Sequence, residues 1–202
     1  MADGQRVRGT PLESESPSSL VEGVVPVVIE PLGSGTQWQH TLPSVHTVIH
    51  LAARVHIMDD KSSYPLTEFR KVNVEGTARL AREAAKTGVK RFVFISSIKV
   101  NGEETNTPYT PESPPNPTDP YGISKYEAEQ VLRKIEAETG LEVVVIRPTL
   151  VYGPGVKANF LNMMKCLKGN FGFWILGFGF WVKNLTSSTC FYREQTQSCL
   201  CW

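Results

Sequence analysis

Tyr121 and Lys125 are the residues of this sequence best suited to proton chemistry. They lie four residues apart at the start of a helix predicted over residues 124–139, so their side chains point the same way, one turn apart. A phenol has a pKa near 10 and is a poor base at neutral pH. A neighbouring ammonium group and the positive end of a helix both favour the phenolate and would move the tyrosine towards acid–base behaviour. The same spacing also arises by chance. Tyr121 would then simply end a loop, and Lys125 would be a solvated helix residue, so the surrounding elements must distinguish the two interpretations.

Two further hydroxyl groups, those of Ser96 and Ser97, come at the end of a predicted buried strand. In a doubly wound sheet, ligands bind beyond the carboxyl ends of the strands. A serine hydroxyl at that point could form a hydrogen bond with a reacting sugar or carbonyl oxygen and with the tyrosine phenol. The simpler interpretation is that the two serines only mark the end of the strand and have no role in a site.

The elements that must position these groups alternate between strand and helix patterns. Apolar, β-branched runs predict strands, and stripes of apolar residues that end at a glycine predict helices. The predicted strands are residues 24–29, 47–53, 91–96 and 143–146, and the predicted helices are residues 66–87 and 124–139, followed by Gly88 and Gly140. Near-continuous apolar strands belong to a sheet covered on both faces. Strands alternating with helices predict an α/β fold with a doubly wound parallel sheet.

Composition divides the 202 residues into three segments. Residues 1–20 are polar and rich in serine, which predicts a mobile N-terminal segment. Residues 21–165 contain the α/β pattern. Residues 166–202 contain no proline and include all four cysteines and three of the four tryptophans, without a helical or clean strand period. We expect this tail to diverge from the preceding domain and to be poorly ordered.

Composition also excludes several classes of protein. A net charge of +1 without a basic block argues against nucleic-acid and anionic-membrane partners. The apolar stretch at residues 171–182 is shorter than the roughly 20 residues needed to cross a bilayer. Cysteines confined to the tail fit a reducing cytosol, which predicts a cytoplasmic protein. His40, His46 and His56 show no metal-ligand pattern, so we expect no metal site.

Five motifs occur in order along residues 21–165 and resemble those of the extended short-chain dehydrogenase/reductases. They are His-Leu-Ala-Ala at residues 50–53, Asn-Val-Glu-Gly-Thr at 73–77, Phe-Val-Phe-Ile-Ser-Ser at 92–97, Tyr-x-x-x-Lys at 121–125 and Arg-Pro-Thr-Leu-Val-Tyr-Gly-Pro at 147–154. More narrowly, the set resembles the NAD-dependent epimerase/dehydratase family, which acts on nucleotide sugars. The resemblance implies a Rossmann-like fold, NAD or NADP as cofactor and a nucleotide-sugar substrate.

The resemblance also implies catalytic roles. Tyr121 would be the general acid and base that exchanges a proton with a sugar hydroxyl. Lys125 would bind the nicotinamide ribose and lower the pKa of the tyrosine. Ser97 matches the catalytic serine or threonine of the family better than Ser96 does.

Binding roles follow from the same resemblance. Leu51, Ala52 and Ala53 would line the cofactor groove, Asn73 would lie on the cofactor side of a long helix, and Pro148 would lie against the nicotinamide amide. Asn159 and Phe160 would reach the nucleotide part of the substrate. Simpler interpretations are a tolerated polar helix residue for Asn73, a strand stop for Pro148 and ordinary helix packing for Asn159 and Phe160.

The sequence departs from the family at both ends. No G-x-x-G-x-x-G motif precedes Val24, and the Gly-Ser-Gly at residues 33–35 lacks the third glycine. The fold is therefore expected to be incomplete, without the first βα unit, and the cofactor pyrophosphate would lack its helix N-terminus. The tail does not resemble the family's substrate region.

The residues after Ser97 bear on the reaction. Dehydratases of the family usually have Asp-Glu there, whereas this chain has Ile98 and Lys99, which disfavours dehydration. Epimerisation at the sugar C4, as UDP-glucose 4-epimerases perform, or reduction of a 4-keto sugar needs only the Ser-Tyr-Lys set. Asn101 stands where many epimerases of the family have tyrosine, which slightly favours the reductase-like or polysaccharide-building branch.

Other functions stay open. One is a truncated, non-catalytic remnant or pseudoenzyme that at most associates with a full-length relative. Another is a steroid- or flavonoid-type reductase of the same superfamily. By resemblance, the chain could form a homodimer through the helices predicted at residues 66–87 and 124–139.

Overall fold

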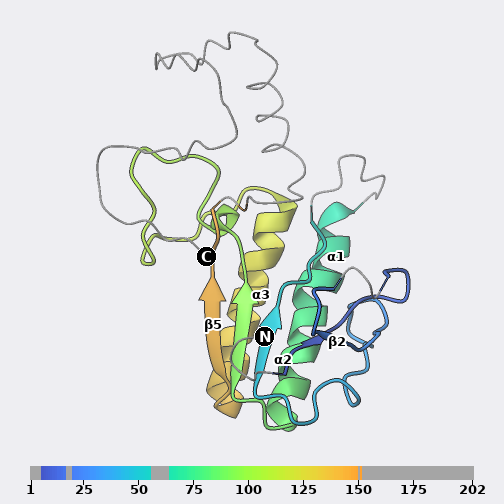
Figure 1. Cartoon of the computed structure of the whole chain (residues 1–202). Coiled ribbons are helices and arrows are strands. Elements are labelled where there is room, and N and C mark those ends of the chain that lie inside the picture. The colour runs from blue at the N-terminus through green and yellow to red at the C-terminus, as the bar shows by residue number, and fades with distance from the viewer. Residues whose placement is uncertain (1–5, 17–19, 56–63, 150, 152–202) are drawn as a thin grey trace, which may run out of the picture. The chain divides into compact units, whose positions relative to one another are not determined.

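The computed structural model describes residues 6–16, 20–55, 64–149 and 151 of the 202-residue chain. Its central feature is a parallel sheet of three strands, β3 (Thr47–His50), β4 (Arg91–Ile95) and β5 (Glu142–Ile146), in the order β3-β4-β5 (Figure 1). β3 pairs in register from Thr47 opposite Arg91, and β4 pairs with β5 from Arg91 opposite Glu142. Three of the predicted strands and their parallel arrangement are therefore confirmed.

Helical segments connect these strands. The first connection contains α1 (Pro65–Arg70), a π-helix η2 (Lys71–Gly76) and α2 (Thr77–Lys86). The second contains a short 3-10 helix, η3 (Ile98–Val100), and the long helix α3 (Pro120–Thr139). Gly88 and Gly140 follow the ends of α2 and α3 with positive φ angles of 82° and 72°, as expected for helix stops. Both predicted helices are confirmed.

The beginning of α3 differs from the prediction. The helix starts at Pro120, not at Ser124, because Asp119 caps it. The Asp119 carboxylate accepts hydrogen bonds from the backbone N–H groups of Tyr121 and Gly122 at 2.9 and 3.1 Å. A proline at the first helical position completes a favourable N-terminus. Tyr121 therefore lies in the first turn of α3.

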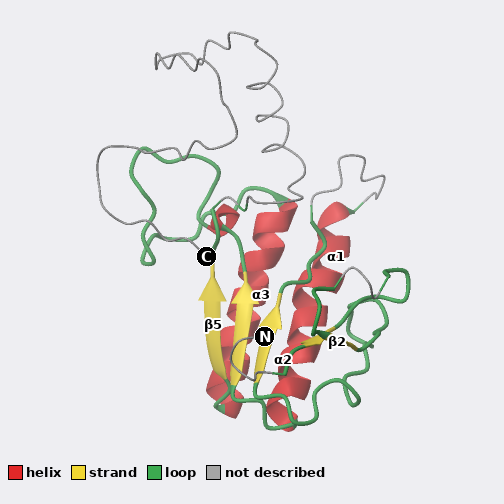
Figure 2. Cartoon of the chain, viewed as in Figure 1, coloured by secondary structure: helices red, strands yellow, loops and turns green. Residues whose placement is uncertain are grey.

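The core fills the space between the helices and one face of the sheet. Phe92, Phe94 and Val143 alternate along β4 and β5 and point to the helical layer, where they meet Leu80, Ala81, Ala84, Ala128, Leu132 and Ile135. Figure 2 shows the helices of both connections behind the three strands. The strands follow one another in a single direction, so connections of the same hand place both helices on the same face.

The opposite face of the sheet differs from the prediction. Its side chains include Ile49 and Ile146, which are 62% and 45% exposed. Among the described residues, helices cover only one face of the sheet, whereas coverage of both faces was predicted. In a doubly wound sheet, the second face is covered by helices of the other half of the sheet, and the described helices belong to one half.

The N-terminal part forms a separate two-stranded parallel ladder of β1 (Arg8–Gly9) and β2 (Val25–Pro26). The backbone N–H of Val25 donates to the carbonyl of Val7, and that of Val27 donates to Gly9, both at 2.9 Å. The strand predicted over residues 24–29 is thus reduced to two residues outside the central sheet, with Val25 57% exposed. Proline in this run removes a backbone donor, which suits the edge of a small ladder better than a central strand. β1 lies within the segment predicted to be mobile.

Among the described residues, no helix is both long and apolar enough to cross a bilayer, and no group of three or more His, Cys, Asp or Glu side chains could bind a metal ion. The apolar stretch at residues 171–182 and all four cysteines lie outside the described residues.

Candidate active site

The carboxyl ends of the three strands bring the predicted site residues to one edge of the sheet. The segments that follow β4 and β5 are joined there, because the N–H of Ser96 donates to Ile146 at 2.7 Å and the N–H of Ile98 donates to Pro148 at 3.1 Å. After β3, Leu51 is 72% exposed, Ala52 is exposed and Ala53 is half-buried. This is the edge at which open α/β sheets bind ligands.

The two serines have different partners. Ser96 is buried, and its hydroxyl donates to the carboxylate of Glu129 at 2.5 Å. The side chain of Ser97 accepts the N–H of Lys99 at 3.3 Å, and its hydroxyl is near enough to the phenol of Tyr121 to lower the pKa of that phenol. The structure therefore places Ser97, and not Ser96, beside the tyrosine.

A close backbone contact fixes this pairing. A Cβ atom added to Gly122 would lie 2.9 Å from the carbonyl oxygen of Lys99, so only glycine lets the first turn of α3 approach η3 this closely. The phenol of Tyr121 is held on its other side by the edge of the Phe69 ring, with 6.2 Å between the ring centroids. Gly122 lies within the Tyr-x-x-x-Lys motif at a position that the motif leaves unspecified.

We expect Gly122→Ala to lower the free energy of unfolding by about 1–3 kcal/mol, because the added methyl meets a backbone oxygen that cannot rotate away. The gain in helix propensity, at most about 1 kcal/mol, does not offset this. Urea denaturation followed by tryptophan fluorescence measures the change. Gly35→Ala is the matched control, since nothing lies within 4 Å of its added Cβ. Equal stability of the two variants would contradict the close contact.

The pKa of Tyr121 moves in the opposite direction to the one expected from sequence. Burial is the largest influence and raises the pKa, and the charge of Asp119 raises it further. The hydrogen bond with Ser97 and the charge of Lys99 lower it without reversing the effect of burial. Lys125 is not among the groups that shift it, so the expected lowering by Lys125 is wrong for this structure.

Lys99 is a site residue whose position the sequence analysis did not foresee. Its ammonium group pairs with Glu103 at 2.8 Å and with the Asp119 carboxylate at 3.3 Å. Since Asp119 caps α3, Lys99 connects the segment after β4 to the helix that presents Tyr121. The Asp-Pro pair before the motif is a helix-start signal that could have revealed this arrangement.

The side chain of Lys125 is buried, with only 2% of it exposed. Its Nζ lies 4.1 Å from the centroid of the Phe94 ring, a cation–π contact. Burial lowers its pKa to about 8, and the charge of Glu129 opposes that shift. Within the part of the chain that the structure describes, no hydrogen-bond acceptor for this ammonium group is found.

Asn73 is buried at the π-helix and is fully occupied by protein contacts. Its Oδ1 accepts the N–H of Arg54 at 2.7 Å, and its Nδ2 donates to the carbonyl of Arg54 at 3.0 Å and to Ser124 Oγ at 2.9 Å. The π-helix inserts an extra residue per turn and buries Asn73. Asn73 thus fixes the segment that follows β3.

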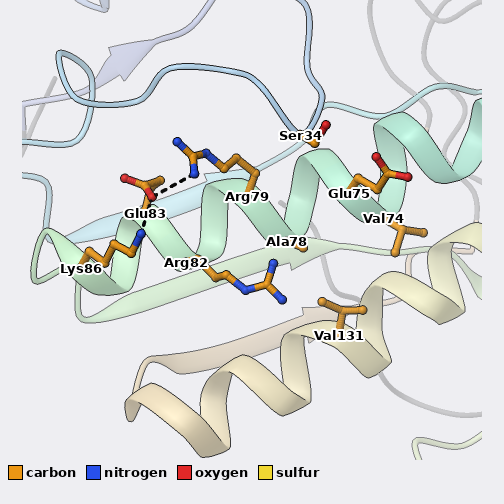
Figure 3. A pocket seen from close by; sticks show the side chains of 9 residues that line it. All are labelled: Ser34, Val74, Glu75, Ala78, Arg79, Arg82, Glu83, Lys86 and Val131. Atoms are coloured by element: carbon orange, nitrogen blue, oxygen red, sulfur yellow. Dashed lines mark hydrogen bonds and ion pairs between the residues drawn. The ribbon is translucent and has the colours of Figure 1, made fainter.

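A pocket of about 430 Å³ lies elsewhere, between α2 and α3 (Figure 3). Its lining includes Arg79, Glu83 and Lys86, and Glu83 pairs with Lys86 at 2.9 Å and with Arg79 at 3.4 Å. None of the predicted site residues lines it. Asn159 and Phe160, predicted to contact the substrate, lie outside the described residues.

Comparison with known proteins agrees with this arrangement. The sequence model of the NAD dependent epimerase/dehydratase family matches residues 4–168, which begins earlier than the segment over which the motifs were recognised. The chain is 51% identical over 136 residues to a UDP-glucose 4-epimerase of Vibrio cholerae, covering 66% of this chain and 42% of that protein.

Solved structures give the same result. A UDP-glucose 4-epimerase from Thermotoga maritima, solved with UDP-glucose, superposes with a TM-score of 0.66 at 28% identity, covering 82% of this chain and 56% of that one. A short-chain dehydrogenase/reductase superfamily protein from Agrobacterium tumefaciens with bound NAD gives a TM-score of 0.59 at 32% identity, covering 71% and 42%. The chain spans less than half the length of the Vibrio relative. With a family match over more than half of its residues and a Rossmann-like fold, the chain belongs to the NAD-dependent epimerase/dehydratase family.

Proposed function

We propose that this chain carries the proton-transfer side of an NAD(P)-dependent nucleotide-sugar 4-epimerase, with Ser97, Tyr121 and Lys125 as its catalytic residues. The observation that supports this most is the close approach of the first turn of α3, which carries Tyr121, to the segment after Ser97 at the carboxyl edge of the sheet, where the Ser97 side chain acts on the Tyr121 phenol. The similarity to the Vibrio UDP-glucose 4-epimerase favours a UDP-hexose as substrate.

The residues present fit the nicotinamide and ribose part of the cofactor. Lys125, whose side chain is 2% exposed, holds its ammonium group over the ring of Phe94, a placement that suits a donor to ribose hydroxyls. Leu51 and Ala52, which follow β3, are exposed at the carboxyl edge of the sheet. By the resemblance to the family, Ala53 and Pro148 would also contact the cofactor, and Asn73 fixes the segment after β3 through Arg54. NAD, when bound, would accept and return the hydride at the sugar C4.

The protein's own part in the reaction is the movement of one proton. Tyr121 would take the proton of the C4 hydroxyl as the sugar is oxidised and return it when the 4-keto sugar is reduced on its other face. Ser97 would form a hydrogen bond to the same oxygen. Because burial raises the pKa of Tyr121, deprotonation is the demanding step, and the positive charge of Lys99 favours it.

The geometry around Lys99 supports epimerisation or 4-keto reduction over dehydration. Elimination of water needs a second acid–base pair near the sugar. The positions after Ser97 are Ile98 and Lys99, and Lys99 is held in ion pairs with Glu103 and Asp119. We infer that these positions serve the tyrosine rather than a second proton transfer.

A second candidate function is a non-catalytic chain that at most associates with a full-length relative. A chain with this function would not bind NADH. The predicted homodimer and the cytoplasmic location stay predictions under either function.

Titration of the purified chain with NADH, followed by its fluorescence, separates the two functions. For the enzyme, we expect saturable binding that Lys125→Met weakens about 10–100-fold, the value of hydrogen bonds from a charged group. Lys134→Met removes an exposed lysine of the same helix and is the control. UDP-glucose is then tested for conversion to its C4 epimer, with 4-keto sugars and steroids as a substrate panel. Absence of NADH binding in the unmodified chain would overturn the enzymatic proposal.

A further inference from the structure

A buried carboxylate, that of Glu129, joins three elements behind the candidate site. Glu129 is 3% exposed and accepts a hydrogen bond from Ser96 Oγ. Arg147, which follows β5, donates to both of its oxygens, from Nε at 3.0 Å and from Nη2 at 2.6 Å. The remaining Nη1 donates to Asn101 Oδ1 at 3.2 Å. The network therefore connects α3 to the segments that leave β4 and β5.

Glu129 is placed to act on both neighbours of the tyrosine. Its bond to Ser96 fixes the residue directly before Ser97, whose hydroxyl meets Tyr121. It also lies one helical turn after Lys125 on the buried side of α3, and its negative charge stabilises the ammonium form of that lysine. Two hydrogen bonds from one arginine hold this buried carboxylate in a fixed orientation.

We propose that Glu129, oriented by Arg147, is a positioning residue that keeps Lys125 charged and holds Ser97 against Tyr121. The catalytic use of this arrangement rests on the proposed function. The effect of Glu129 on Lys125 and on Ser97 can be measured on this chain alone. Neither Glu129 nor Arg147 contacts the reacting atoms in this assignment. Lys125 and Ser97 do, and Glu129 acts through them.

The other groups around Lys125 do not replace this charge. On β3, His50 is buried and neutral at physiological pH, because burial lowers its pKa to about 3. On β4, Phe94 offers only its ring face. Arg147 is cationic and already paired with Glu129, and Tyr121 is a neutral phenol at neutral pH because its pKa is raised. Among the described groups, Glu129 is therefore the anion that acts on Lys125.

The test reads the charge of Lys125 directly. The full chain is labelled with ε-13C lysine, the Lys125 signal is assigned with Lys125→Arg, and its pKa is measured by NMR without cofactor or substrate. Because burial already lowers this pKa to about 8, we expect Glu129→Gln to lower it further, to about 7 or below. The same variant should weaken NADH binding at pH 8 in proportion to the lost charge.

Two comparisons make the result decisive. Glu127→Gln removes the same charge two residues away, where Glu127 pairs with Arg70 at the surface, and we expect it to leave the Lys125 pKa within about 0.2 of the unmodified value. Glu129→Asp keeps the carboxylate but shortens it, so its Lys125 pKa should lie between those of Glu129→Gln and the unmodified chain. If Glu129→Gln does not fold, as circular dichroism would show, Glu129→Asp decides. An unchanged Lys125 pKa overturns the proposal, whereas failure of NADH to bind any variant would refute the proposed function and leave the NMR result standing.

Discussion

Tyr121→Phe is expected to lower the turnover of a UDP-hexose about 10²–10⁴-fold, the usual contribution of a positioned general acid–base group. The substitution removes one oxygen atom and leaves the ring that contacts Phe69. The proposed proton transfer has no substitute donor, because Ser97 is not basic and the Lys99 ammonium is held by Glu103 and Asp119. Turnover is measured by the rate of C4 epimer formation at saturating NAD.

The control for this loss is Tyr109→Phe, which removes a phenol that donates to the Glu104 carbonyl in an exposed loop. Binding of NADH and the midpoint of urea denaturation should be alike in both variants, which would locate the loss in the chemical step. Turnover of Tyr121→Phe within tenfold of the unmodified chain would exclude the proton-transfer role.

The second large effect concerns stability in acid and arises from His50, at the end of β3. This imidazole is 4% exposed, lies between the rings of Phe92 and Phe94, and forms a hydrogen bond with Thr77 Oγ1 at 2.9 Å. Burial and then the charge of Lys125 lower its pKa from 6.5 to about 3. Between pH 6.5 and 3 the unfolded chain therefore binds one proton that the folded chain does not.

That difference in proton binding destabilises the folded state as the pH falls, by about 3 kcal/mol at pH 4 and up to about 5 kcal/mol below pH 3. We expect His50→Gln, which can still pair with Thr77, to lose this part of the pH dependence while costing some packing energy at pH 7. Urea denaturation at pH 7 and pH 4 gives the two slopes. His40→Gln removes an exposed imidazole and is the control. Parallel slopes for His50→Gln and the unmodified chain would show that His50 titrates normally and is not enclosed by the two phenylalanines.

The strands and helices of the central sheet were predictable because each carries a strong local signal. Val-Val-Val-Ile and Arg-Phe-Val-Phe-Ile form β5 and β4 in parallel register, and glycines end α2 and α3. The run at residues 24–29 was predicted wrongly as a strand of the buried sheet. β-Branched residues gave it a strand's composition, but whether such a run joins the central sheet depends on distant partners, and its partner is β1.

The candidate site was predictable in its residues but not in its electrostatics. The order of the motifs placed Ser97 and Tyr121 at the same edge of the sheet, and their catalytic roles stay predictions. The sign of the Tyr121 pKa shift depends on burial and on Lys99, which approaches from a different segment, and neither can be read from the spacing of Tyr121 and Lys125. The burial of Asn73 was missed for a similar reason, since an α-helical period cannot anticipate an inserted residue.

The π-helix at Lys71–Gly76 changes the angular phase of one continuous helical connection midway along its length. Before it, Phe69 meets the ring of Tyr121, and after it, Ala81 and Ala84 face the sheet. An uninterrupted α-helix would keep the same angular phase along its whole length. Its buried stripe could then face only one of these two neighbours. The extra residue lets the two halves of this connection pack against different neighbours. The amino-terminal half contacts the ring of Tyr121, and the carboxyl-terminal half packs against the sheet.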